Sequence, residues 1–284
     1  MTRQTGTRQA GVLLRLAQGA LIGLGAVLPG ISGGVLCVIF GVYQPVMELL
    51  SHPARVFRKN ARLLLPVLLG VALGFLGIAK LLGFLLERYP NPSVCLFVGL
   101  IGGMLPSLFR EAGEKGRGRS AWVALGVAFA VVLALLATLR AVSVTIAPSL
   151  GWYLFCGFCL ALSVIVPGMS FSTLLMPLGL YTPFVAGIGG LDLAVLLPGG
   201  LGALATVLLL SRAVTRLMET RYAVMFHAII GVVVAATLAI IPFGSFATDI
   251  DSCLTNLLCL VLGILAALAL DRLNSRVEKP EDDA

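Results

Sequence analysis

A polar, glycine-rich turn occurs twice in this chain, each time between strongly apolar segments. The first copy is Leu28-Pro29-Gly30-Ile31-Ser32-Gly33-Gly34, and the second is Val166-Pro167-Gly168-Met169-Ser170-Phe171-Ser172. Identities continue downstream at a constant offset of 138 residues, as far as Pro45 and Pro183. Such a doubled turn predicts a chain built from two equivalent halves. The matching positions are Pro29, Gly30, Ser32, Leu36, Gly41, Tyr43 and Pro45 against Pro167, Gly168, Ser170, Leu174, Gly179, Tyr181 and Pro183.

The composition places these turns in a membrane protein. Of the 284 residues, 59% are hydrophobic and only 12% are charged, and the mean hydropathy is +1.04. A soluble domain has no use for so much apolar surface, so we predict an all-α polytopic membrane protein. The apolar segments are residues 11–28, 33–50, 63–86, 93–109, 121–147, 151–166, 171–188, 194–217, 223–242 and 253–271.

The repeat extends beyond the turns. At an offset of 132, Pro66 meets Pro198, Gly70 meets Gly202, and Arg140 meets Arg272. Each half then comprises a re-entrant or broken helical hairpin plus three transmembrane helices. Three crossings turn the second half upside down, so we predict two inverted-topology repeats, in which the hairpin tips enter the protein interior because lipid cannot surround a broken backbone. The predicted units are residues 11–147, residues 151–272 and a polar cytoplasmic tail at 273–284.

The basic residues predict the orientation. If the N-terminus is cytoplasmic, 17 of the 20 Lys and Arg residues fall in cytoplasmic segments. The segment around Asp249 and Asp251 has no basic residue and is expected outside. By the positive-inside rule, both termini are cytoplasmic. The net charge of +7 is then explained by topology, and no nucleic-acid partner is predicted.

The chemistry of the turns suggests an anion site. Pro29-Gly30 ends one helix and Ser32 can cap the next, which leaves the first backbone N–H groups of that helix without intrahelical partners. Helix starts of this kind attract phosphate and carboxylate groups. A tight membrane turn with no ligand is the structural alternative. The N–H donors are expected at Gly33, Gly34 and Val35 in the first copy, and at Phe171, Ser172 and Thr173 after the cap Ser170 in the second.

Two cations lie within predicted spans at equivalent positions, Lys80 and Arg212. Such cations normally face the protein interior and pair with an anion, although they can also extend to the headgroups. His227 can carry a proton, or be a buried histidine with its hydrogen bonds satisfied. Cys156 and Cys159 lie in an apolar run with no second ligand pair, so no metal site, cofactor or catalytic residue is predicted.

The doubled motif, with Gly41-x-Tyr43 in one half and Gly179-x-Tyr181 in the other, resembles the bacterial PopT-type polyprenyl-phosphate transporters over residues 11–272. The resemblance implies an inner-membrane flippase, not an enzyme. It would return undecaprenyl phosphate to the cytoplasmic leaflet, so that the lipid carrier is recycled for cell-wall (peptidoglycan) synthesis. With the two cations and Thr173, we expect the substrate-binding residues to be Gly30, Ser32, Gly33, Gly34, Lys80, Gly168, Ser170, Ser172, Thr173 and Arg212.

Two other functions are compatible with the sequence. Membrane-embedded polyprenyl-diphosphate phosphatases have a similar turn, but hydrolysis needs an acid or base and cationic charge near the phosphate. Here Ser32 is followed by Gly33 and Gly34, and Ser170 by Phe171 and Ser172. Neither turn therefore supplies an acid, a base or a cation. The second alternative is an ion-coupled transporter of a small soluble anion. For a carrier, the coupling ion would be a proton or sodium, and the further partners are the membrane lipids.

Overall fold

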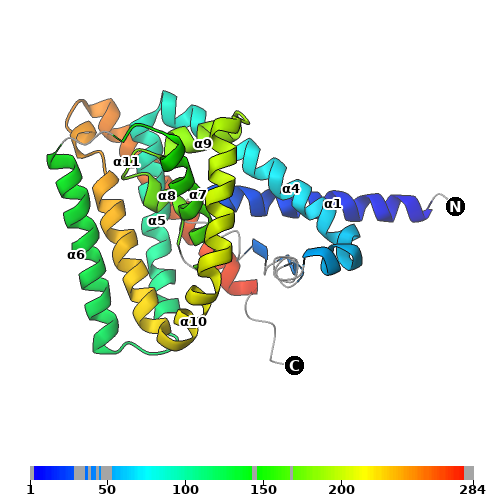
Figure 1. Ribbon diagram of the computed structural model, residues 1–284. Helices are drawn as coiled ribbons and strands as arrows, with labels where there is room; N and C mark the ends of the chain where they lie inside the picture. The colour runs from blue at the N-terminus through cyan, green and yellow to red at the C-terminus, as the bar shows by residue number, and fades with distance from the viewer. Residues whose placement is uncertain are drawn as a thin grey trace.

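The computed structural model describes residues 3–28, 36–37, 40–42, 45, 53–142, 146–166 and 169–277 (Figure 1). In these residues the secondary structure is helical, which confirms the predicted all-α class. The helices are α1 (Arg3–Val27), α4 (Pro53–Arg88), α5 (Pro90–Ala112), α6 (Arg119–Ala141), α7 (Leu150–Ile165), α8 (Phe171–Leu175), α9 (Tyr181–Gly189), α10 (Leu193–Ile240), the 3-10 helix η1 (Phe243–Phe246) and α11 (Ile250–Val277).

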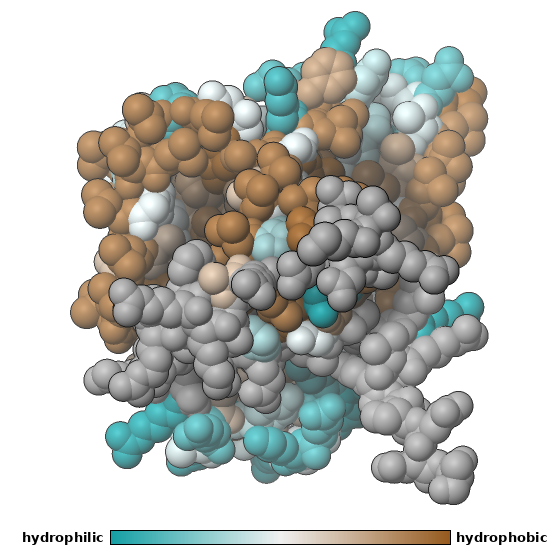
Figure 2. Space-filling model, turned by 90° about the vertical axis from the view of Figure 1, so that its right-hand side faces the viewer, coloured by the Kyte–Doolittle hydropathy of each residue, from teal (hydrophilic) through white to brown (hydrophobic). Residues whose placement is uncertain are grey.

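Six segments of the described helices are long and apolar enough to cross a membrane, as the prediction of three spans per half requires. On the face seen in Figure 2, apolar side chains gather in a broad band, with hydrophilic residues above and below it. The chain is therefore a multi-pass membrane protein. The spans are Leu63–Arg88, Pro90–Ala112, Arg119–Ala141, Leu193–Ser211, Arg216–Ile240 and Ile250–Arg272.

The second hairpin is more broken than the sequence predicts. Its first arm, α7, has 16 residues and is about 24 Å long, which is less than the hydrocarbon core of a bilayer. The return arm, expected as one segment over 171–188, ends after the five residues of α8 and resumes as α9. Gly179 lies between them with φ 71°, and the N–H of Leu180 donates to the carbonyl of Leu175 at 3.1 Å. A glycine in the left-handed region with this bond is a common helix stop.

A second difference concerns the segments 194–217 and 223–242, which the sequence predicts as separate helices. They continue into each other as α10, and the helix is interrupted only at Arg221, where φ is −136° and ψ is 38°. A single non-helical residue is enough to redirect the helix axis, so the predicted change of direction occurs without a loop.

The two halves make equivalent local contacts in the described residues. Val42 and Leu180, separated by 138, both donate their N–H five residues back, to Cys37 and Leu175, at 2.9 and 3.1 Å. Gly41 has φ 64°, close to the value at Gly179. The matching sequence positions therefore share this local backbone conformation. The inversion of the second half stays a prediction.

Glycines let equivalent helix pairs approach closely, as is common between membrane helices. α1 packs on α4, and α7 packs on α10. A Cβ on Gly70 would lie 2.1 Å from the carbonyl oxygen of Leu16, and a Cβ on Gly202 would lie 2.0 Å from that of Leu154. Gly70 and Gly202 correspond at the offset of 132, and Leu16 and Leu154 at 138, so the same contact occurs in both halves.

The α7–α10 contact gives a prediction with a matched control two residues away. Gly202→Ala should lower the thermal unfolding midpoint, because overpacking costs about 1–3 kcal/mol. Gly200→Ala should keep or raise the midpoint, because a Cβ added there would meet nothing within 4 Å and alanine is favoured over glycine in helices by about 0.8–1.0 kcal/mol. Thermal unfolding of the purified variants in one detergent measures both. A midpoint for Gly202→Ala at or above that of Gly200→Ala would contradict the close approach.

Candidate functional site

The tip of the second hairpin carries a small cluster of hydroxyl groups on three residues. Ser170 occupies the N-cap position of α8, as predicted, but its side chain makes no capping hydrogen bond. Its Oγ lies 2.7 Å from the Oγ of Ser172. Two hydroxyls joined by one hydrogen bond retain one further proton to donate. The pair can therefore still offer a hydrogen bond to a ligand.

Thr173 is held by the carbonyl group of Ser170. The Thr173 hydroxyl donates to this carbonyl at 2.6 Å, and the Thr173 N–H donates to it at 3.2 Å. Ser and Thr side chains often form such local bonds at helix starts. The expectation that the Thr173 N–H is a free donor was therefore wrong, because a tight first turn gives it a backbone partner.

Two of the three hydroxyl residues lie inside the protein, and Ser170 is half-buried. Ser172 is fully buried and Thr173 is 2% exposed. Phe171 is also buried, and its ring packs against those of Tyr181 and Phe184, with centroids 5.5 and 6.3 Å apart. Burying a polar group costs free energy unless the group makes a hydrogen bond, so buried hydroxyls normally have partners. The second hairpin thus places hydrogen-bonding groups in the interior, as the sequence predicts.

Tyr181 joins the second hairpin to the start of the first turn. Its hydroxyl donates to the carbonyl of Val27 at 3.1 Å, between residues separated by 154 positions. Val27, Phe171 and Tyr181 belong to one buried cluster. Because Val27 directly precedes the Leu28–Gly34 turn, the chain enters the first turn beside α9. Tyr181 was not among the predicted site residues, although it and its repeat mate Tyr43 both belong to the doubled motif.

Several predicted site residues cannot be placed in this geometry. The residues that lie outside the described part of the chain are Gly30, Ser32, Gly33, Gly34 and Gly168. Arg212 lies within α10, but its side chain is outside the described part. The structure therefore brings together Ser170, Ser172 and Thr173, and the role of the other residues stays a prediction.

Lys80 is exposed on α4. Its backbone lies against the end of α9, because a Cβ on Gly189 would lie 2.7 Å from the backbone nitrogen of Lys80. No ion pair or hydrogen bond joins the Lys80 ammonium group to any of the described residues. The structure thus leaves the Lys80 ammonium free to meet an anion but shows no contact between it and the hydroxyl cluster.

His227 is a second polar group in the interior. It is fully buried in α10, where its Nδ1 lies 2.7 Å from the carbonyl oxygen of Ala223. Its ring meets Trp122 edge-on, with centroids 5.3 Å apart. The Nε2 atom is buried and has no hydrogen-bond partner among the described residues. The expectation of a buried histidine is met, but only one of its two ring nitrogens is satisfied.

Metal binding finds no support in the part of the chain that the structure describes. No three His, Cys, Asp or Glu side chains gather there in a way that could hold an ion. Cys156 and Cys159 are buried in α7 and are free thiols.

Charge is distributed unevenly between the two ends of the helix bundle. The basic end contains the connection between α5 and α6. There Arg110 pairs with Asp271 at 2.5 Å, and the Lys115 ammonium lies 4.6 Å from the ring centre of Tyr222. At the opposite end, Asp249 accepts hydrogen bonds from the N–H and hydroxyl of Ser252 at 2.6 and 2.9 Å. These bonds, the backbone one foremost, lower the pKa of Asp249. The two ends lie at the bottom and top of Figure 1, respectively.

Comparisons with known proteins agree with this architecture. A family model described as undecaprenyl phosphate translocase-like matches residues 52–257. A polyprenyl-phosphate transporter of Staphylococcus aureus is 25% identical over 279 residues, which cover 93% of this chain and 98% of the relative. A polyprenyl-phosphate transporter of Vibrio cholerae is 28% identical over 194 residues, which cover 63% of this chain and 61% of the relative. No solved structure matches. Because the family match spans well over half of the sequence, the chain belongs to the undecaprenyl phosphate translocase-like family.

Proposed function

We propose that this protein carries undecaprenyl phosphate from the outer to the cytoplasmic leaflet of the bacterial inner membrane, which recycles the lipid carrier of cell-wall synthesis. The observation that carries the proposal is the buried hydroxyl cluster at the tip of a broken hairpin, inside a bundle of membrane-spanning helices. The family and the names of both relatives support a polyprenyl phosphate as the substrate.

The chemistry of the tip suits a phosphate monoester. Such a headgroup carries a charge of about −1.5 to −2 and has three strong acceptor oxygens. It needs donors and positive charge before it can enter a low-dielectric region. The hydroxyls of Ser170 and Ser172 supply donors, and the predicted N–H groups after Ser32 supply more. Lys80 and Arg212 offset the charge. Hydroxyl and backbone donors hold an anion without fixing it irreversibly, as a carrier requires.

Transport is a better account of this cluster than hydrolysis. A phosphatase needs a general acid or base beside the phosphate. In the described part of the second hairpin, the polar side chains around Ser172 are the hydroxyls of Ser170 and Thr173. Purified protein should therefore release no inorganic phosphate from a polyprenyl diphosphate, in contrast to the phosphatase alternative.

Orientation follows from the uneven charge of the two ends. The basic end should face the cytoplasm together with both termini, and the Asp249 end should face outward. Single cysteines at Lys115 and at Asp251, in a background without the six native cysteines, test this with an impermeant reagent. Only the Asp251 position should label from outside intact cells. Labelling at Lys115 from outside would reverse the topology.

The mechanism predicts how substitutions at the first turn and at the two cations affect transport and binding. Gly33→Val should slow transport more than Ser32→Ala, because its side chain blocks the approach to the backbone, whereas loss of a cap costs only about 1 kcal/mol. The Lys80→Ala/Arg212→Ala double variant should weaken binding of the phosphate lipid but not of the uncharged polyprenol.

Leaflet-resolved transport of polyprenyl phosphate in liposomes, at matched protein amounts, measures these effects. Thr206→Val is the control for Ser32→Ala. It also removes one hydroxyl, but the Thr206 hydroxyl bonds within α10, to Gly202 at 2.7 Å. Full activity in Gly33→Val, or in the double variant, would place the anion elsewhere. Uptake of free inorganic phosphate with no movement of the lipid would favour the small-anion alternative.

A proton is the coupling ion that the buried residues favour. A histidine nitrogen can bind and release a proton, and the buried Nε2 of His227 has no hydrogen-bond partner among the described residues. His227→Gln should remove the response of the transport rate to an imposed pH gradient. Thr237→Val, which alters a buried hydroxyl of the same helix, should keep that response. A response that survives in His227→Gln, or a response to a sodium gradient alone, would contradict this assignment.

A further inference from the structure

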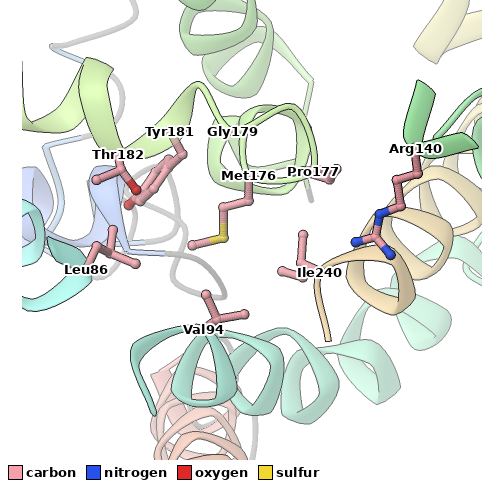
Figure 3. A pocket seen from close by; sticks show the side chains of 9 residues that line it. All are labelled: Leu86, Val94, Arg140, Met176, Pro177, Gly179, Tyr181, Thr182 and Ile240. Atoms are coloured by element: carbon pink, nitrogen blue, oxygen red, sulfur yellow. The ribbon is translucent and has the colours of Figure 1, made fainter. Parts of the chain in front are cut away.

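A cavity of about 210 Å³ opens at the Asp249 end of the helix bundle. Its wall combines the ends of several helices with the segment between α8 and α9 (Figure 3). A water molecule occupies about 30 Å³ in the liquid, so the space suffices for a group considerably larger than water. The wall residues that bear on ligand binding are Leu86, Val94, Arg140, Met176, Thr182 and Ile240.

Arg140 is the cation of this cavity. It extends from the last turn of α6, and its guanidinium lies beside Ile240 (Figure 3). One N–H donates to the carbonyl of Ala239, near the end of α10. A guanidinium has five N–H donors in a fixed fork, so this bond orients the group and leaves other donors unused. No acidic side chain pairs with Arg140 among the described residues.

Apolar side chains form one part of the wall. Leu86, Val94 and Met176 face the cavity from α4, α5 and the segment after α8, and Thr182 adds one hydroxyl (Figure 3). An arginine matches phosphate geometry with two parallel hydrogen bonds. An apolar wall beside it would accept the first carbons of a lipid chain. One cation, one hydroxyl and apolar walls together fit an amphiphile with an anionic head.

The cavity adjoins the hairpin tip through α8. Met176, in the cavity wall, donates its N–H to the carbonyl of Ser172 at 2.9 Å. The five residues of α8 span only about 8 Å. The Met176 side of the cavity therefore lies one short helix away from the buried hydroxyls.

We propose that this cavity is the site where the phosphate headgroup of a polyprenyl phosphate first binds from the outer leaflet, with Arg140 as its charge partner and the apolar wall holding the first isoprene units. The assignment rests on the proposed function. It adds a second binding position, nearer the membrane surface than the hydroxyl cluster.

Binding of farnesyl phosphate, a short polyprenyl phosphate, to the purified full-length protein in detergent tests the assignment. Arg140→Gln should weaken binding by about tenfold or more, as expected for loss of a charge-assisted hydrogen-bonding partner. Arg88→Gln is the matched control, because Arg88 is an exposed arginine at the same end whose guanidinium lies over the Tyr89 ring rather than in the cavity. Its affinity should equal that of the wild type. Farnesol should bind Arg140→Gln and the wild type alike.

A second variant separates binding from folding. Val94→Phe fills the cavity without removing the bond between Arg140 and Ala239, and it should weaken farnesyl phosphate binding even if Arg140→Gln fails to fold. Wild-type affinity in Val94→Phe, or in folded Arg140→Gln, would overturn the assignment while leaving the proposed function intact. A wild-type protein that binds no farnesyl phosphate would overturn the assignment, whereas the proposed function fails if polyprenyl phosphate does not move between the leaflets of liposomes. Equal competition by inorganic phosphate would show that the cavity recognises phosphate alone, without the lipid chain, and would also overturn the assignment.

Discussion

Lipid offers no hydrogen-bond partner, so a broken helix at membrane depth must be enclosed by protein. The second hairpin depends on this constraint. After α7 ends, the chain makes only the short helix α8 before it stops again at Gly179. The Thr173 hydroxyl at this interruption bonds locally to the Ser170 carbonyl, and the neighbouring Phe171 ring packs against the ring of Tyr181. A site built this way is enclosed by protein and yet remains polar.

Close helix packing makes that enclosure feasible. Where the backbones of α7 and α10 nearly touch at Gly202, and those of α1 and α4 at Gly70, the hairpin arms are fixed against long helices. The bond from Tyr181 to Val27 then connects the two hairpins directly. Between membrane helices, contacts of this kind replace the hydrophobic effect, which is weak where the solvent is itself apolar. The tips are therefore positioned by packing rather than by the short helices themselves.

The sequence predicts much of this architecture because the relevant signals are local or periodic. Apolar length gives the six spans, and the doubled motif gives the second hairpin and the equivalence of Gly41 and Gly179. The stop at Gly179 was missed even though Gly41 repeats it, because an apolar run of that length resembles one continuous arm. The cavity at Arg140 depends on residues that only tertiary packing brings together, such as Leu86 and Ile240. No spacing in the sequence could reveal it.

The placement of charge and hydroxyl groups suggests how a carrier can bind an anion and still release it. A cation lowers the energy of a headgroup most where the dielectric is low, so a deeply buried arginine would trap the ligand. Here Arg140 is exposed near the surface, whereas Ser172 and Thr173, which are neutral, are buried. In the proposed mechanism, the strong attraction of Arg140 acts at entry, and in the interior neutral donors hold the headgroup while Lys80 and Arg212 offset its charge. This ordering keeps the bound states close in free energy, and a substrate moves quickly only between states of similar free energy.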